Sequence, residues 1–208
     1  MTSLRYKIRP YGHGKAGEAI LNDTDAPCFV FRGNDVLLSS SPEMPLTGDV
    51  VRELFPDVLR EGTFTRGDVL CRWIEISPQV PPPDGTEFSG MRGTWSAFGD
   101  EWFSRAGHAY QLMEWERTTR HCSRCGAAMR NHATDRAKEC PSCGFVSYPV
   151  ICPVVIVAVV RDGKLLLARN AGFPTGRHSV IAGFVEAGES LEARSEERRV
   201  GKECRSRW

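Results

Sequence analysis

The sequence has no apolar run long enough to cross a membrane and almost no excess of charge of either sign. Its longest apolar stretch, 154–160, is far shorter than the roughly 18 residues of a membrane-spanning helix. The 27 Lys and Arg residues balance 26 Asp and Glu residues, so no strong field favours nucleic acid or a membrane surface. The N-terminus also lacks the apolar segment of a secretory signal. We therefore expect a cytoplasmic protein with no membrane partner.

The apolar residues indicate a mixed α+β fold with a β-rich N-terminal part. Within 1–77, apolar runs flank the turn sequence "GND", and 68–76 predicts a further strand. The Pro-rich segment 77–85 predicts a connector, since proline removes backbone donors. The apolar spacing then predicts a helix over about 100–119.

Three more strands are predicted further along the chain. Residues 154–160 form a continuous apolar run, as in a buried strand. Asp162-Gly163 is a strong hairpin signal, and 164–168 predicts the returning strand. Residues 178–184 predict the third strand, directly before a Gly- and Glu-rich stretch.

Four of the eight cysteines form two CxxC pairs, which indicates a metal site rather than disulfides. Two residues between cysteines allow one tight turn to direct both sulfurs at one ion, and Gly126 and Gly144 favour such turns. Because every ligand is a cysteine, no position stays open for water, and we predict a structural Zn²⁺. The ligands are Cys122, Cys125, Cys140 and Cys143.

A zinc ribbon can by itself bind nucleic acid, and this alternative stays open. The loop between the cysteine pairs, 126–139, has three Lys or Arg residues and no aromatic residue. Without a stacking platform or a basic stripe, we expect only weak nucleic-acid binding.

The segment "GFVEAGES", 183–190, resembles the start of the Nudix box, the signature of hydrolases that cleave nucleoside diphosphates linked to another group. Gly183 and Glu189 occupy its first two fixed positions, and Glu186 lies between them. The four-cysteine ribbon, "YP" and an apolar strand come before the box. This order is similar to the NADH pyrophosphatase (NAD⁺ diphosphatase) branch of the Nudix hydrolase family.

The resemblance implies three parts in an α+β fold. It implies a β-rich N-terminal domain over 1–119, a four-cysteine zinc ribbon over 120–149, and an incomplete Nudix α/β/α sandwich over 150–208. We expect that sandwich to be truncated at its C-terminus. Members of the branch are homodimers, so we also expect a homodimer.

The resemblance also implies hydrolysis of the diphosphate bond of NAD(H) to AMP and nicotinamide mononucleotide, with Mg²⁺ or Mn²⁺. Removal of NAD caps from RNA by the same site is an alternative. A non-catalytic zinc-binding interaction module is an alternative of another class.

Several single residues match positions with roles in that branch. Asp135, Tyr148 and Arg92 match substrate-binding positions. Ala182 matches a position whose backbone carbonyl binds a divalent cation. Glu189 is the candidate catalytic residue, although we expect it to brace the box loop more than to bind metal.

After Glu189 the chain departs from the box. The box has Arg-Glu at 197–198 and Glu-Glu at 201–202, where this chain has Glu197-Arg198 and Gly201-Lys202. The glutamates that bind metal from one helix face are therefore missing, and we expect impaired hydrolysis by this chain. We also expect that this segment cannot form the amphipathic helix of the fold.

The segment 194–208 is interpreted as a non-native tail. Its first eleven residues, "RSEERRVGKEC", are encoded by a DNA sequence that resembles a sequencing adapter. The alternatives are a natural pseudoenzyme ending and a substitute metal site made by Glu189, Glu192 and Glu196.

Overall fold

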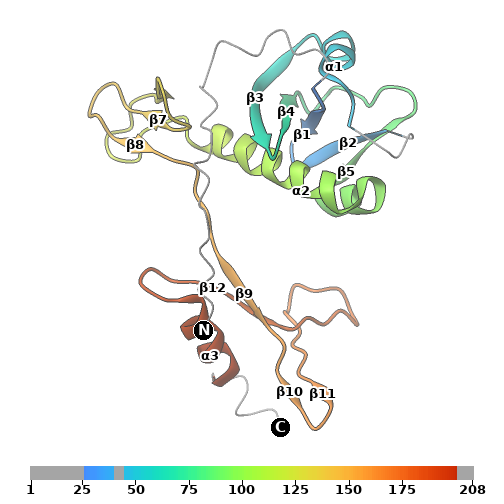
Figure 1. Ribbon diagram of the computed structural model, residues 1–208, viewed down its shortest axis with the longest axis vertical. Coiled ribbons are helices and arrows are strands. Elements are labelled where there is room, and N and C mark those ends of the chain that lie inside the picture. Colours follow the sequence, from blue (N-terminus) through green and yellow to red (C-terminus); the bar gives the residue numbers. More distant parts are fainter. Residues whose placement is uncertain (1–25, 40–44, 201–208) are drawn as a thin grey trace. The chain divides into compact units, whose positions relative to one another are not determined.

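The computed structural model describes residues 26–39 and 45–200, and the chain divides into two compact units, 1–149 and 150–208. Within the described residues, the first unit holds a five-stranded sheet, two helices and a small three-stranded sheet (Figure 1). The predicted mixed α+β class with a β-rich N-terminal part is confirmed. The parts of 1–77 at 1–25 and 40–44 lie outside the described residues.

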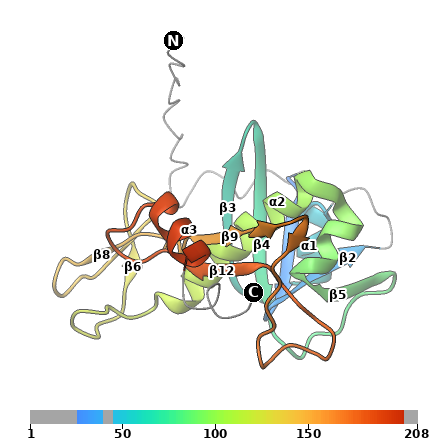
Figure 2. The same ribbon diagram turned by 90° about the horizontal axis from the view of Figure 1, so that it is seen from below.

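The five-stranded sheet has the order β3-β4-β1-β2-β5. Its strands are β1 (Cys28–Arg32), β2 (Asp35–Ser39), β3 (Val58–Arg66), β4 (Val69–Ile76) and β5 (Thr86–Gly90). β1 and β4 run parallel, and the other neighbours are antiparallel. The predicted turn joins β1 to β2 at Gly33, whose φ is 62°. The long β3–β4 hairpin turns at Gly67 (Figure 2) and contains the strand predicted at 68–76.

Both faces of this sheet are buried, because successive side chains of a strand point to opposite sides. On one face, Phe29 and Phe31 of β1 pack with Ala106, Ala109 and Met113 of α2 (Met91–Thr118). On the other face, Cys28 and Val30 pack with Val51 of α1 (Gly48–Leu54) and with Phe55. A strand covered on both faces has no polar alternation, which explains the continuous apolar run of β1.

The long helix α2 begins nine residues before the predicted helix start at about residue 100. The helix kinks at Gly99, where φ is 71° and ψ is −177°, and the predicted helix corresponds to the part after the kink. The predicted connector 77–85 is confirmed, but β5 and the first part of α2 were not predicted. Only glycine adopts these dihedral angles without strain, so Gly99 marks the bend.

The second unit contains a two-stranded sheet, a short hairpin and one helix among its described residues. β9 (Val154–Val157) pairs antiparallel with β12 (Ile181–Phe184). β10 (Val160–Arg161) and β11 (Lys164–Leu165) form the hairpin predicted at Asp162-Gly163, with φ values of 48° and 72°. The single strand predicted over 154–160 is wrong, since β9 ends before β10 begins. The strands predicted over 164–168 and 178–184 are shorter than expected.

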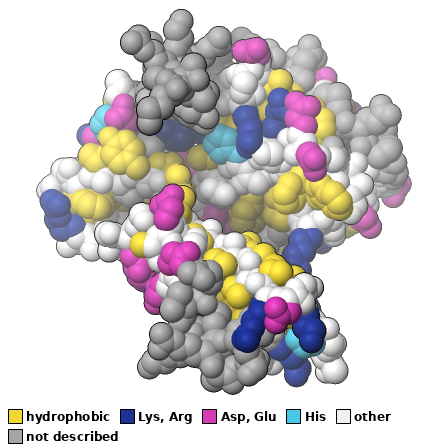
Figure 3. All heavy atoms as spheres, turned by 60° about the horizontal axis from the view of Figure 1, so that its bottom comes forward, with side chains coloured by type: hydrophobic (Ala, Val, Ile, Leu, Met, Phe, Trp, Pro, Cys, Tyr) yellow, Lys and Arg dark blue, Asp and Glu magenta, His cyan; other side chains and the backbone are white. Residues whose placement is uncertain are grey.

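Much of this second unit is exposed. Val155 and Ile181 are buried, but Ile156 and Phe184 are 70% and 61% exposed. Apolar side chains are visible at the molecular surface in Figure 3. The described part of this unit therefore has a much smaller core than the first unit.

The helix α3 (Leu191–Val200) forms where the box helix belongs, in a segment that we expected to lack the amphipathic helix of the fold. Leu, Glu, Ala and Arg all have high helix propensity, so a helix forms here without a continuous apolar face. The Ser190 hydroxyl accepts a hydrogen bond of 3.0 Å from the Ala193 N–H and caps the first turn. Arg194 also pairs with Glu197 one turn later. Local propensity and capping therefore outweigh the lack of large apolar residues.

Across residues 26–39 and 45–200, no helix combines the length and apolar character that a membrane crossing requires.

Truncation of Ile76 to Ala should destabilise the first unit strongly. Ile76 on β4 is fully buried, so the substitution leaves a cavity and is expected to cost about 2–5 kcal/mol of unfolding free energy. Urea unfolding of the full chain measures this cost. The isomeric control, Leu59→Ala, removes a side chain that is 55% exposed and should change stability by about 0.5 kcal/mol or less. Equal losses in the two variants would contradict the assigned core.

Candidate functional site

The four paired cysteines lie on two turns, one before the small three-stranded sheet and one between its second and third strands. Its strands are β6 (Arg130–Asn131), β7 (Lys138–Glu139) and β8 (Val146–Ser147). At each turn a glycine N–H donates to the carbonyl of the first cysteine: Gly126 to Cys122 at 2.8 Å, and Gly144 to Cys140 at 3.0 Å. Both glycines have positive φ, 78° and 70°, as the two tight turns require. The two turns therefore have the same structure, and each contributes two cysteines to one site.

The four cysteine sulfurs converge on one point. They lie within 4.8 Å of one another, with Cys122 and Cys143 at 3.6 Å and Cys125 and Cys140 at 3.4 Å. A tetrahedral ion with Zn–S bonds of about 2.3 Å has sulfur–sulfur edges of about 3.8 Å. Disulfide sulfurs would be about 2.05 Å apart. The cluster therefore fits a structural Zn²⁺, as predicted.

The zinc ribbon, 120–149, contacts the C-terminal end of α2. Lys138 on β7 is only 8% exposed, and its Nζ lies 2.5 Å from a carboxylate oxygen of Glu116. The same ammonium lies 5.9 Å from the ring centre of Trp115, within cation–π range. A buried ion pair next to an aromatic ring thus joins the ribbon to the helix that covers the main sheet.

Asp135 and Tyr148, two of the three predicted substrate residues, meet on the ribbon. The Tyr148 hydroxyl donates to Asp135 Oδ2 at 3.2 Å, and the Tyr148 side chain is 56% exposed. The Asp135 N–H donates to His132 Nδ1 at 3.2 Å, which fixes the turn that carries the carboxylate. The hydrogen bond to the Asp135 carboxylate, together with its negative charge, raises the pKa of Tyr148. The pair presents an exposed aromatic ring next to an acidic acceptor.

His132 was missed as a part of this arrangement. Its ring nitrogen also accepts from the Thr134 N–H at 3.4 Å, so it organises the whole turn before Asp135. The spacing His132-x-Thr134-Asp135 is a local signal that sequence reasoning could have used.

Arg92, the third predicted substrate residue, is not brought to the Asp135–Tyr148 pair. Arg92 is exposed in the first turn of α2, whereas the ribbon follows the last turn. The helix after the Gly99 kink alone spans on the order of 25 Å at 1.5 Å per residue.

The box residues lie in the second unit. Ala182 and Gly183 are on β12, opposite Ile156 and Val155 of β9. In the loop that follows, the Glu186 N–H donates to Glu189 Oε2 at 2.9 Å. Glu189 therefore closes its own loop, which agrees with the bracing role expected for it.

Two arginines of α3 lie against this loop. Arg194, 9% exposed, has its Nη1 at 3.7 Å from Glu189 Oε1 and also pairs with Glu197. A Cβ atom at Gly183 would collide with the Arg198 guanidinium, so that cation packs directly on the glycine. Arginine side chains therefore lie next to the box residues, where a metal-dependent Nudix hydrolase would need carboxylates to bind its cations.

The residues present do not fit a catalytic Mg²⁺ or Mn²⁺. Such ions prefer several carboxylate or carbonyl oxygens. In the described part of the chain, the four cysteines form the one group of three or more His, Cys, Asp or Glu side chains able to hold an ion. The alternative of a substitute site made by Glu189, Glu192 and Glu196 is therefore not supported among the described residues, and Glu189 already pairs with Arg194.

Comparison with known proteins supports the ribbon and its surroundings. Residues 117–148 match the family model of the NADH pyrophosphatase zinc ribbon domain. The chain is 33% identical over 183 residues to "NAD-capped RNA hydrolase NudC" of Deinococcus radiodurans, which covers 86% of this chain and 62% of that relative. It is 37% identical over 131 residues to the protein of the same name from Stutzerimonas stutzeri, covering 63% of this chain and 46% of that relative.

The chain is related to the NudC and NADH pyrophosphatase family. A further relative of the same name, from Pseudomonas aeruginosa, is 44% identical over 90 residues, 43% of this chain and 32% of that relative. The predicted family is therefore confirmed. The chain spans roughly one third to three fifths of the length of these relatives, so the activity of the whole NudC-type protein is a matter for proposal.

Loss of one ribbon cysteine should abolish tight zinc binding. Cys140→Ser removes one of four thiolates, and the apparent zinc affinity is expected to fall by at least about 100-fold. Competition with a chromophoric chelator measures the affinity, and the unchanged chain should bind one Zn²⁺. The control is Cys152→Ser, which alters an exposed cysteine outside the cluster and should leave zinc affinity unchanged. Equal zinc binding by both variants would rule out the four-cysteine site.

Removal of the Asp135 charge should lower the pKa of Tyr148. The negative carboxylate disfavours the phenolate, so Asp135→Asn should return the Tyr148 pKa toward its ordinary value of about 10. The ¹³Cζ signal of Tyr148, followed by NMR as pH rises, gives this pKa. Asp84→Asn, in the connector before β5, is the control and should leave the curve in place. An unshifted curve in Asp135→Asn would show that the two side chains do not interact.

Proposed function

We propose that the whole NudC-type protein represented by this chain hydrolyses the diphosphate bond of NAD, with the NAD cap of RNA as its substrate. The observation that carries the proposal is the similarity to three proteins named NAD-capped RNA hydrolase, one of them matched over 86% of this chain. The domain division 1–119, 120–149 and 150–208, a homodimer and a catalytic Mg²⁺ or Mn²⁺ belong to the same proposal. Hydrolysis of free NAD(H) to AMP and nicotinamide mononucleotide would use the same bond.

The Asp135–Tyr148 pair supports a role for the ribbon in holding the dinucleotide. An exposed tyrosine ring offers a stacking surface to a base, and the carboxylate beside it accepts hydrogen bonds from ribose hydroxyls. In this proposal the ribbon contributes substrate contacts, while the metal that activates the diphosphate is bound elsewhere. Arg92 and the Ala182 carbonyl remain proposed contacts to substrate and to the divalent cation.

A second candidate function applies to these 208 residues. The chain acts as a zinc-binding interaction module without hydrolytic activity, because Arg194 and Arg198 lie against the box loop. Glutamates at 201–202 are absent as well, since Gly201 and Lys202 occupy those positions. A metal-dependent hydrolase needs these negative charges to hold its cations.

The decisive experiment compares the chain with a chimaera. In the chimaera, residues 1–193 are joined to the segment that follows the equivalent position in the Stutzerimonas stutzeri relative. Both proteins are incubated with NAD-capped RNA and with NADH in the presence of Mn²⁺. The chimaera should release nicotinamide mononucleotide from capped RNA, and the 208-residue chain should be inactive.

The two substrates and one variant separate the alternatives. If the chimaera cleaves NADH but not capped RNA, the free dinucleotide is the substrate. If a folded, zinc-loaded chimaera cleaves neither, the hydrolase proposal fails and the interaction module replaces it. Glu189→Ala in the active chimaera should lower turnover, since the loop then loses the side-chain oxygen that accepts from the Glu186 N–H.

A further inference from the structure

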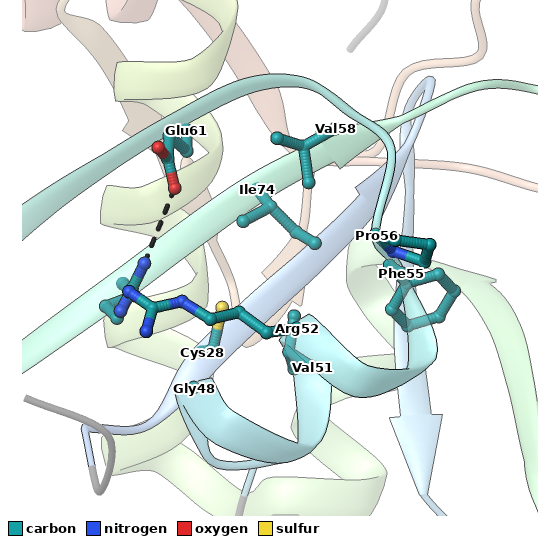
Figure 4. Close-up of a pocket in the computed structure, with 10 residues that line it drawn as sticks. Cys28, Gly48, Val51, Arg52, Phe55, Pro56, Val58, Glu61 and Ile74 are labelled. Carbon is teal, nitrogen blue, oxygen red and sulfur yellow. Dashed lines mark hydrogen bonds and ion pairs between the residues drawn. The ribbon is translucent and has the colours of Figure 1, made fainter. Parts of the chain in front are cut away.

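A cavity of about 240 Å³ opens in the first unit, between α1 and the main sheet. Its lining residues include none of the ribbon cysteines, neither Asp135 nor Tyr148, and no residue of the box. Its apolar walls come from Val51, Phe55, Pro56, Val58 and Ile74, as Figure 4 shows. The volume lies just below the range of roughly 300–1,000 Å³ typical of ligand pockets, so the cavity suits a small molecule.

Arg72 on β4 lines this cavity and is poorly compensated. Its side chain is 6% exposed, and Nη2 lies 3.4 Å from Glu61 Oε2, the ion pair marked in Figure 4. That distance is longer than the roughly 2.7–3.2 Å that is usual for such hydrogen bonds. The Glu61 side chain is also 51% exposed, so water competes for its carboxylate. The buried Nη1 has no hydrogen-bond partner among the described residues.

Glu75, the other buried charged residue of β4, has two ion-pair partners. Glu75 is 5% exposed, and its carboxylate accepts from Arg60 at 2.5 Å and from Arg117 at 3.5 Å. β3 and α2 therefore provide one partner each for the buried Glu75, whereas Arg72 has a single distant partner. A buried ion without full pairing is costly, so the Arg72 guanidinium, whose Nη2 has only the long contact to Glu61, favours an acceptor that enters the cavity.

We propose that this cavity binds a small carboxylate with an apolar body. The planar guanidinium of Arg72 matches a carboxylate, and the aliphatic walls match a short hydrocarbon chain. Arg52 and Glu61 also line the cavity.

The site binds without covalent chemistry. Cys28 also lines the cavity, but burial raises the pKa of its thiol to about 12, even though Arg72 acts in the opposite direction. A thiol that stays protonated at neutral pH is a poor nucleophile. The ligand is therefore held by the guanidinium and the apolar walls alone.

Calorimetric titration of the full, zinc-loaded chain tests the proposal, with hexanoate, acetate and inorganic phosphate as probes. Hexanoate should bind at one site per chain, with a dissociation constant on the order of 1 mM. Acetate lacks most of the apolar body and should bind more than about tenfold more weakly. Arg72→Gln should weaken hexanoate binding by at least about tenfold.

Two tryptophan variants keep the test valid if Arg72→Gln does not fold. Val58→Trp places a large ring at the cavity wall and should abolish binding, whereas Leu59→Trp alters the next residue, which does not line the cavity. Leu59→Trp should bind hexanoate like the unchanged chain. Three results would overturn the proposal: no saturable hexanoate binding, binding that survives Val58→Trp, or phosphate binding as tight as hexanoate.

Discussion

The attraction of four cysteine sulfurs for one ion is the constraint on which the candidate site depends. The strands of the ribbon have two residues each, too few to persist through backbone hydrogen bonds alone. A structural zinc replaces the apolar core that so small a unit cannot build. Asp135 lies in the segment between the cysteine pairs, and Tyr148 follows β8. Their mutual orientation therefore depends on the metal, although neither residue touches it.

The features that could be predicted from the sequence are those determined by neighbours in the chain. A few consecutive residues determine the local structure in three cases: the CxxC spacing with a following glycine, the Asp162-Gly163 hairpin, and the apolar run of β1. The helix after Gly99 was predicted for the same reason. Local patterns of this kind change little with the rest of the fold.

The features that could not be predicted depend on contacts between distant segments or on subtle local balances. β5 is an edge strand that forms because β2, much earlier in the chain, offers it a partner, with Asp35 opposite Gly90. The incomplete pairing of Arg72 needs the positions of Glu61 and of α1, which no local pattern encodes. The bounds of helix α3 were not predicted, because they depend on a sum of propensities and on the cap by Ser190 rather than on apolar spacing.

The Lys138–Glu116 ion pair links metal binding by the ribbon to the stability of the first unit. Lys138 lies on β7 and Glu116 on the helix that covers the main sheet. Unfolding of the ribbon after loss of the ion would therefore remove the Lys138 ammonium from the partly buried Glu116 carboxylate. Zinc occupancy and folding of the N-terminal sheet are therefore thermodynamically linked, by the general rule that a ligand stabilises the state it binds. Chelation would weaken a domain that supplies no metal ligand, and damage to that domain would loosen the metal.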